Sequence, residues 1–288
     1  TLRGTFRAQM SPALKMPDVG FRCAADTVQS HPFTILEAFD DAKLDGWQPL
    51  QPDDGAAWTV ARGGAAVCFT EATYVNLAGK GFPNQLGTHE DALIPGLRRL
   101  IEEVEAAGAL LAPQIFHAGR TALSAVTGVP ILGPSPIMHP VSDEMPREMT
   151  GADVKEAIRA YGEAARRVRE AGAKMMEVHG ATWYLLQQFF SPVSNERTDE
   201  WGGSLEKRMR FPLEEMVVSY RTCLLEPWEG GFTAEDTLAL AAGLKEAGMD
   251  IIHCSRNARN GVPVLPDLYN PAFQRLKKKV GLPLIANG

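Results

Sequence analysis

Apolar positions along the chain alternate, from about residue 65 onward, between short unbroken runs and longer stretches with helical spacing. The unbroken runs predict buried strands at 65–70, 109–116, 173–178, 249–254 and 282–286. The stretches with helical spacing predict helices at 91–107, 152–171, 204–220, 234–247 and 271–280. Thr150 and Thr233 stand where N-caps belong, and a glycine follows three of these helices, at Gly108, Gly172 and Gly248.

This order of strands and helices predicts a parallel sheet covered by helices, because its strands are apolar on both faces. Polar residues follow the predicted strand ends, at Glu71, His117, His179, Ser255 and Asn287. In a (β/α)8 barrel the strand ends form the catalytic face, and a doubly wound sheet also binds ligands there. No GxGxxG motif follows a strand, which favours the barrel.

Residues 1–64 do not follow this rhythm and predict an irregular N-terminal segment, which leaves 65–288 as the barrel domain. The net charge of −6 argues against a nucleic-acid partner, and no apolar run is long enough to span a membrane. None of the four cysteines has metal-site spacing, so we expect buried free thiols, no metal and a cytoplasmic location. The chain begins without a Met, so it can be part of a longer protein.

The densest polar chemistry follows the predicted strand at 173–178. His179 comes directly after the strand and Tyr184 comes five residues later. An imidazole N–H is a good donor to a carbonyl oxygen, and a phenol can deliver a proton to a carbanion. The alternative is a hydrogen-bonded core histidine beside a packed tyrosine.

Gln114 lies inside a predicted strand, where a buried amide must find partners. Its donor and acceptor suit a planar heterocycle, although a position at a sheet edge or facing a loop would also explain a glutamine here.

Arg120 could bind an anion or form a surface ion pair. The run 194–204 could bind an anion at the helix that follows or be held by its own backbone contacts. Lys277, Lys278 and Lys279 predict a solvated helix face.

Four blocks of sequence resemble the old yellow enzyme family of flavin-dependent (β/α)8 oxidoreductases. They are Thr70–Val75, Gly81–Gly87, Gln114–Arg120 and the long block from Glu177 to Phe211. The last block is specific, because it joins His-x-x-x-x-Tyr to Asn-x-Arg-Thr-Asp-x-x-Gly-Gly-Ser. A weaker similarity continues to residue 288.

The resemblance implies FMN as cofactor, NADH or NADPH as reductant, and hydride transfer by way of the flavin to an activated C=C bond. It implies that Gln114 binds the flavin pyrimidine edge, that Ala72 lies beneath the rings and that Gly288 begins a phosphate-binding loop. His179 would hold the substrate oxygen, and Tyr184 would be the proton donor.

The chain also departs from the family pattern. Thr182 stands where the family has a His or Asn donor to the substrate, and Trp183 replaces a glycine, so its indole should crowd the pocket or displace Tyr184. Only Arg221–Trp228 separates the predicted helix from Glu229, where the family has a strand with a flavin-contacting arginine. We therefore expect a barrel that lacks one internal strand and the C-terminal strand and helix.

Residues 1–28 resemble the C-terminal end of a formylglycine-generating (sulfatase-modifying) domain, through Leu2–Arg7 and Val19–Ala24. Residues 9–13 can instead be the opening strand of the flavin barrel.

The sequence leaves three functional hypotheses. The first is an ene-reductase acting on an enone or enoate. The second is an amine or N-methyl dehydrogenase with the same flavin, because aromatic pockets suit cationic amines. The third is a non-catalytic partial barrel that acts as a binding or assembly module. A small-molecule substrate is expected, and homo-oligomerisation or further domains remain open.

Overall fold

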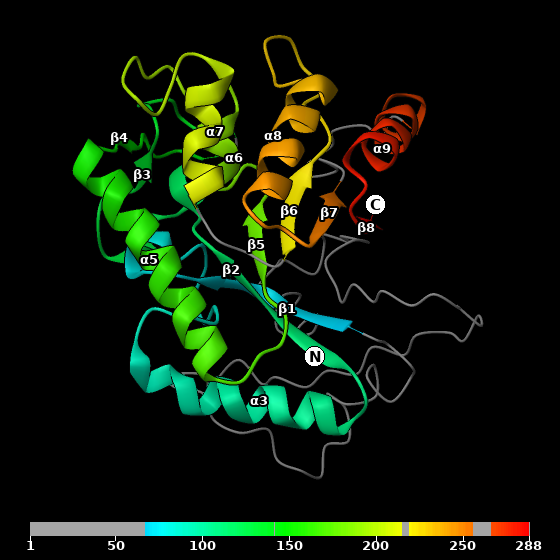
Figure 1. Ribbon diagram of the computed structural model, residues 1–288. Coiled ribbons are helices and arrows are strands. Elements are labelled where there is room, and N and C mark those ends of the chain that lie inside the picture. The colour runs from blue at the N-terminus through cyan, green and yellow to red at the C-terminus, as the bar shows by residue number, and fades with distance from the viewer. Residues whose placement is uncertain (1–66, 141, 215–218, 256–265, 288) are drawn as a thin grey trace.

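The fold is built on six parallel strands that form one sheet (Figure 1). The computed structural model describes residues 67–140, 142–214, 219–255 and 266–287. The strands follow one another in the sheet in the order β1, β2, β5, β6, β7 and β8. Their bounds are Val67–Tyr74, Leu110–Phe116, Glu177–Gly180, Ser219–Cys223, Ile251–Ser255 and Leu284–Asn287. Two short strands, β3 (Leu132–Gly133) and β4 (Arg147–Glu148), pair separately.

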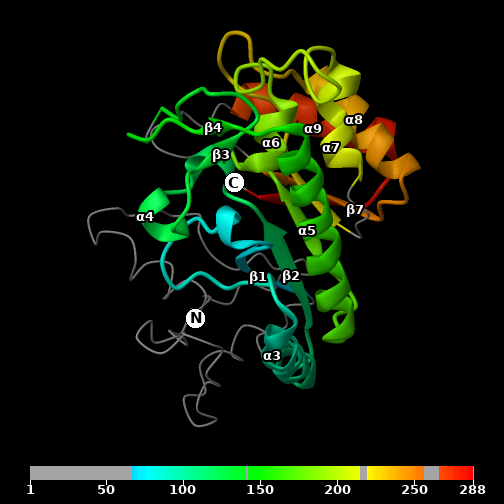
Figure 2. The same ribbon diagram turned by 90° about the vertical axis from the view of Figure 1, so that its left-hand side faces the viewer.

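Helices follow these strands in the chain and cover one side of the sheet (Figures 1 and 2). The longer ones are α3 (Ile94–Ala106), α5 (Gly151–Glu170), α7 (Leu205–Glu214), α8 (Ala234–Glu246) and α9 (Pro266–Val280). Two shorter helices are α4 (Ser124–Thr127) and α6 (Leu185–Phe190). Short 3-10 turns occupy Leu77–Gly79, Asp91–Leu93 and Gly119–Thr121. The predicted alternation of strands and helices and the parallel sheet are confirmed.

The two faces of the sheet differ in chemistry. Ile115, Val178 and Tyr220 point to the outer face and join the core that packs against the helices. Successive strand residues point to opposite faces, so Gln114, Glu177 and the residues in register with them point to the inner face. An apolar cluster on this inner face contains Phe69, Ala112, Met175, Ile251 and Ile285. The polar side chains described below lie on the same face, and some are in register with residues of this cluster.

Helix caps explain why two of the predicted helix starts are correct. Thr150 accepts from the Asp153 N–H, and the Asp153 carboxylate accepts from the Thr150 N–H, which completes a capping box on α5. Thr233 and Asp236 form the same arrangement on α8. Each box satisfies two helix-terminal groups, so the local sequence alone fixes where these helices begin.

Strand β6 corrects the expected helix at 204–220. Helix α7 ends at Glu214, and Ser219–Cys223 pairs with both β5 and β7. The internal strand that we expected to be missing is therefore present. The physical reason is that Tyr220 and Thr222 are good strand formers that bury their side chains, while alternate residues point to the inner face. The predicted strand at 173–178 also starts too early, because β5 begins at Glu177.

Among the described residues the sheet does not close on itself, since β1 and β8 each pair with a single neighbour. The N-terminal segment at 1–64, its resemblance to a formylglycine-generating domain, and Gly288 lie outside the described residues. Cys68, Cys223 and Cys254 are buried free thiols, as predicted. In the described part of the chain, no helix is both long and apolar enough to cross a membrane.

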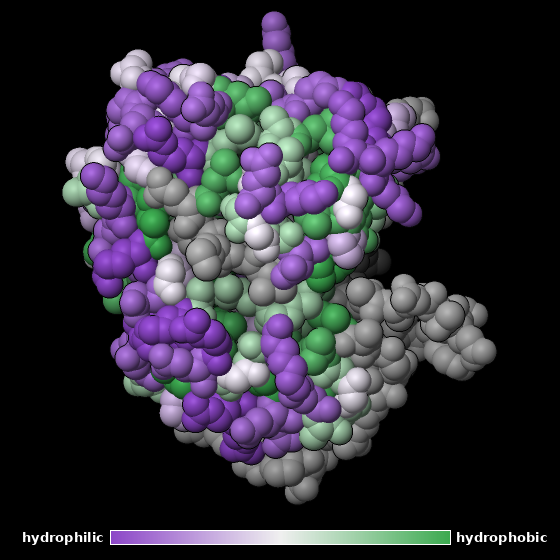
Figure 3. Space-filling view, viewed as in Figure 1, coloured by the Kyte–Doolittle hydropathy of each residue, from purple (hydrophilic) through white to green (hydrophobic). Residues whose placement is uncertain are grey.

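On the face of the molecule seen in Figure 3, hydrophilic residues alternate with apolar areas. Lys277, Lys278 and Lys279 are exposed on α9, as the sequence predicts for a solvated helix face.

Candidate functional site

A strained turn connects the end of β5 to helix α6. Thr182 and Trp183 both have positive φ, at 58° and 62°. A β-branched or bulky residue seldom adopts this left-handed conformation, because its Cβ crowds the backbone. The Gln187 side chain accepts from the Trp183 N–H at 3.0 Å, and Gln188 Nε2 donates to the Trp183 carbonyl at 2.5 Å. Two buried amides of α6 therefore hold the turn in place.

This turn brings the two main candidate residues into contact. The Tyr184 and His179 rings meet edge to face with centroids 4.9 Å apart, and Tyr184 also packs edge-on against Phe116 at 4.6 Å. His179 Nδ1 accepts from the Ala181 N–H at 3.2 Å. A neutral His179 therefore carries its proton on Nε2, which is the form that can donate to a substrate oxygen.

Thr182, the third candidate catalytic residue, has a buried hydroxyl with no hydrogen-bond partner among the described residues. Its backbone N–H points to Cys223 Sγ at 3.5 Å. A buried hydroxyl without a partner costs free energy, so a ligand oxygen that accepted from it would recover that cost. Thr182 can thus supply one donor beside His179.

The Trp183 indole packs among other aromatic rings. Its ring centroid lies 5.3 Å from that of His139 and 5.7 Å from that of Trp228. The indole N–H is buried and has no partner among the described residues. Tyr184 keeps its ring contact with His179, so the crowding that we expected from Trp183 falls on the side of His139 and Trp228.

Gln114 and Ala72 are neighbours in register on β2 and β1. A bulge between Phe69 and Ala72 adds a residue to β1, and the Thr70 hydroxyl accepts from the Gln114 N–H at 2.9 Å. Ala72 also packs against the cluster that contains Phe116 and Tyr184. The structure thus brings Ala72, Gln114, His179 and Tyr184 together on one side of the sheet.

Arg221 is a further candidate site residue, which the sequence did not reveal. It lies on β6 in register with His179, on the inner face of the sheet. One of its guanidinium nitrogens donates to Ser255 Oγ at 2.9 Å, and its charge lowers the pKa of Glu177. The predicted helix at 204–220 hid this strand. The alternation of Ser219, Arg221 and Cys223 with Tyr220 and Thr222 is the signal that could have revealed it.

His117 and Arg120 follow β2 and are both buried. The Gly119 N–H donates to His117 Nδ1 at 3.0 Å, and burial lowers the pKa of His117 to about 3. Arg120 donates to the Ile137 carbonyl at 3.1 Å and forms no ion pair within the described ranges. The surface ion pair considered for Arg120 is therefore not formed there.

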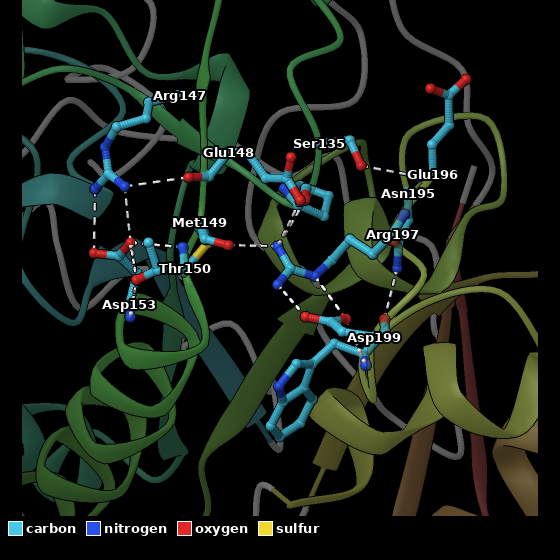
Figure 4. A network of polar contacts seen from close by, with 12 residues as sticks. Ser135, Arg147, Glu148, Met149, Thr150, Asp153, Asn195, Glu196, Arg197 and Asp199 are labelled. Carbon is cyan, nitrogen blue, oxygen red and sulfur yellow. Dashed lines mark hydrogen bonds and ion pairs between the residues drawn. The ribbon is translucent and has the colours of Figure 1, made fainter.

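The run 194–204 is held by contacts within the protein (Figure 4). The buried Arg197 guanidinium donates to the carbonyls of Pro134 and Met149 and forms an ion pair with Asp199. Asn195 Nδ2 donates to the Phe189 and Trp201 carbonyls at 2.7 and 2.8 Å. These bonds support the structural alternative for this run, because Arg197 is already committed to protein partners.

The inner face of the sheet offers hydrogen-bonding groups that suit the pyrimidine ring of a flavin. This ring is the part of FMN that carries hydrogen-bond donors and acceptors. Gln114 Nε2 donates to Glu177 and the Gln114 N–H donates to Thr70, and no bond to Gln114 Oε1 is found among the described residues. The amide therefore keeps an acceptor for a ring N–H, and Arg221 places a positive charge on the same face. No group of three or more His, Cys, Asp or Glu with metal-site geometry occurs in the part that the structure describes.

Known proteins resemble this chain in sequence. The sequence pattern of the NADH:flavin oxidoreductase / NADH oxidase family matches residues 28–286, so the match extends beyond the boundary we drew at 64. A probable NADH-dependent flavin oxidoreductase, YqiG of Bacillus subtilis (strain 168), is 36% identical over 242 residues. An NADPH dehydrogenase of Geobacillus sp. (strain WCH70) is 37% identical over 233 residues.

Solved structures point the same way. A 2-naphthoyl-CoA reductase complex superposes with a TM-score of 0.74 at 28% identity, over 80% of this chain and 40% of that one. Morphinone reductase superposes with a TM-score of 0.69 at 28% identity, over 79% and 68%.

The matches cover only part of each relative. The YqiG and Geobacillus alignments each take in 76% of this chain, but they reach 64% and 65% of those proteins. An NADH:acrylate oxidoreductase of Vibrio harveyi is 35% identical over 271 residues, which are 86% of this chain and 26% of that protein. The family match nevertheless spans most of the chain and reaches every described strand, ending within β8. The chain belongs to the NADH:flavin oxidoreductase / NADH oxidase family.

Proposed function

We propose that this chain is the FMN-binding barrel domain of an NAD(P)H-dependent oxidoreductase that reduces an activated C=C bond of an enone or enoate. Bound FMN supplies the hydride chemistry between the nicotinamide and the substrate. The protein's own residues bind the substrate, orient it and move a proton. The domain would comprise residues 65–288, with Gly288 at a phosphate-binding loop.

The residues divide these tasks by their chemistry. His179 Nε2–H and the Thr182 hydroxyl donate to the substrate oxygen and draw electron density from the C=C bond. The Tyr184 hydroxyl gives the proton to the carbon that does not receive hydride. Gln114 and Arg221 hold the pyrimidine edge of FMN, and the small Ala72 leaves space beneath the rings.

The observation that carries the proposal is the ring contact between His179 and Tyr184, with centroids 4.9 Å apart. The Ala181 N–H donates to His179 Nδ1, which leaves His179 Nε2–H as a donor. Tyr184, whose phenol is the proposed acid, contacts this histidine. A core histidine and a packed tyrosine would not require a strained turn at Thr182 and Trp183 to bring them together.

The test is uptake and reduction of the cofactor. Purified protein incubated with FMN should show a flavin absorption spectrum after gel filtration, and NADH or NADPH should bleach it under anaerobic conditions. An enone should then restore the absorption. Colourless protein that takes up no FMN would contradict the proposal and favour the non-catalytic module.

An amine or N-methyl dehydrogenase is a second candidate, favoured by the aromatic packing of Trp183, Trp228 and His139. Aromatic faces bind cationic amines. Histamine dehydrogenase from Rhizobium sp. 4-9 superposes with a TM-score of 0.71 at 25% identity, over 80% of this chain and 36% of that one. Flavin reduction by a tertiary amine without NAD(P)H would favour this candidate over the ene-reductase.

A further inference from the structure

A buried carboxylate lies in the middle of the inner face of the sheet. Glu177 begins β5, and its side chain has no exposed surface. Its neighbours in register are Gln114 on β2 and Ser219 on β6. Burying an ionised carboxylate costs several kcal/mol unless charges and hydrogen bonds compensate it. The partners of Glu177 therefore indicate the role of this carboxylate.

Three strands contribute those partners. His253 Nδ1 on β7 lies 2.5 Å from Glu177 Oε2, and the His253 ring is also fully buried. Gln114 Nε2 donates to Oε1, and Ser219 Oγ lies 3.4 Å from Oε2. The carboxylate on β5 thus joins the candidate flavin residue Gln114 on the adjacent strand β2 to His253 on β7, three strands from β2.

The charges around Glu177 keep it ionised. Burial acts to raise the pKa of Glu177, but the charge and hydrogen bond of His253, the charge of Arg221 and the Gln114 amide together bring that pKa below its ordinary value. Arg221 lies in register with His253 on the same face. The inner face therefore carries one anionic group, Glu177, with two basic residues on the next two strands, Arg221 on β6 and His253 on β7.

The hydrogen bond to Glu177 fixes which way the Gln114 amide faces. Its NH2 group donates to the carboxylate, and no bond to its oxygen is found among the described residues. Rotating the amide would place its oxygen against the carboxylate oxygen, which is repulsive. Gln114 therefore presents an acceptor toward the proposed flavin site.

We propose that Glu177 and a protonated His253 are positioning residues that orient Gln114 and set how strongly the site prefers reduced over oxidised FMN. This inference rests on the proposed function, because it requires FMN at Gln114. Reduced FMN in its anionic form carries one more negative charge than oxidised FMN. The net charge of Glu177, His253 and Arg221 therefore affects the binding of the two forms differently. The ion pair contributes no net charge, and Arg221 adds a positive charge to the same face.

Replacing each partner by glutamine changes that net charge in opposite directions. Glu177→Gln removes the negative charge, so relative affinity for reduced FMN should rise. His253→Gln removes the positive charge and leaves Glu177 ionised beside Arg221, so relative affinity for reduced FMN should fall. The double variant pairs two amides, which can hydrogen-bond to each other, and restores the wild-type net charge.

The experiment measures the dissociation constant of oxidised FMN and the reduction potential of the bound FMN in the full chain, with no substrate present. We expect each single variant to change the ratio of the two affinities about tenfold, which is about 30 mV for a two-electron couple. The double variant should return to within about threefold of wild type, since the opposing charge changes cancel. A purely structural role would weaken both forms of FMN alike and would not give opposite shifts.

Glu226→Gln is the matched control. Glu226 is also a buried carboxylate, but its partners are Gln187, Ser191 and the Phe232 N–H. Its substitution should leave the ratio of the affinities for reduced and oxidised FMN unchanged. Where a single variant does not fold, as judged by circular dichroism, the other single variant and the double variant still decide the question.

Two outcomes would overturn the inference in different ways. Wild-type protein that takes up no FMN contradicts the proposed function and this inference with it. Wild-type protein that binds FMN, with single variants that shift the ratio in the same direction or not at all, contradicts only the roles of Glu177 and His253.

Discussion

The His179 and Tyr184 rings contact each other edge to face, with their centroids 4.9 Å apart, although a strained turn separates the two residues in the chain. His179 lies one residue before the end of β5 and Tyr184 is the N-cap residue of α6, so the turn at Thr182 and Trp183 decides whether they meet. The same turn contains both departures from the sequence pattern of old yellow enzymes. The stability of this segment is therefore the first property to test.

Gly180→Ala should destabilise the protein by roughly 1–3 kcal/mol, because a Cβ at this position would overlap the Tyr220 hydroxyl of the neighbouring strand. Denaturant unfolding followed by circular dichroism measures the change. Gly162→Ala is the control, since nothing lies within 4 Å of its Cβ in the exposed face of α5. That variant should gain about 0.5–1 kcal/mol, and equal effects at the two positions would contradict the close packing at Gly180.

Arg197→Met should cost about 3 kcal/mol and loosen the run 194–204, because the buried guanidinium binds two carbonyl groups and Asp199. Limited proteolysis together with denaturant unfolding would detect both effects. Arg147→Met removes a comparable but half-exposed ion pair with Asp153 and should cost under about 1 kcal/mol. If Arg197→Met were as mild as this control, the run would not be held by Arg197.

His117 should make the protein sensitive to acid. Its pKa is lowered from 6.5 to about 3 by burial, so between these values the unfolded chain binds a proton that the folded protein does not. The stabilisation is complete above pH 6.5 and is lost as pH falls toward 3, by at most about 5 kcal/mol. His117→Asn keeps an acceptor for the Gly119 N–H, so its unfolding free energy should depend less on pH in this window. Parallel curves for the two proteins would rule out this role of His117.

The parts of the fold that local interactions determine could be predicted from the sequence. The starts of α5 and α8 follow from Thr150 and Thr233, whose capping boxes use only residues of the same turn. Strand β6 could not be read as easily. It is short, and what makes it a strand is its pairing with β5 and β7, which is a long-range interaction.

Some residues of the candidate site could be predicted from the sequence and others could not. Motif spacing suggested His179, Tyr184 and Gln114, and the structure places them near one another. Glu177, His253 and Arg221 carry no local signal of their role, because their relationship exists only across adjacent strands. The positive φ of Thr182 and Trp183 could not be anticipated either, since neither residue type favours that conformation.

The central claim is that Tyr184 donates the proton to the substrate, and the two half-reactions of a Tyr184→Phe variant test it most directly. Stopped-flow absorbance would measure flavin reduction by NAD(P)H and flavin reoxidation by an enone separately, with Tyr161→Phe as a control that removes a hydroxyl from the core behind the sheet. We predict that reoxidation by the enone slows by roughly 10²–10⁴-fold in Tyr184→Phe, while flavin reduction changes little and the control matches wild type. Equal slowing of both half-reactions, or no slowing of either, would contradict the role of Tyr184.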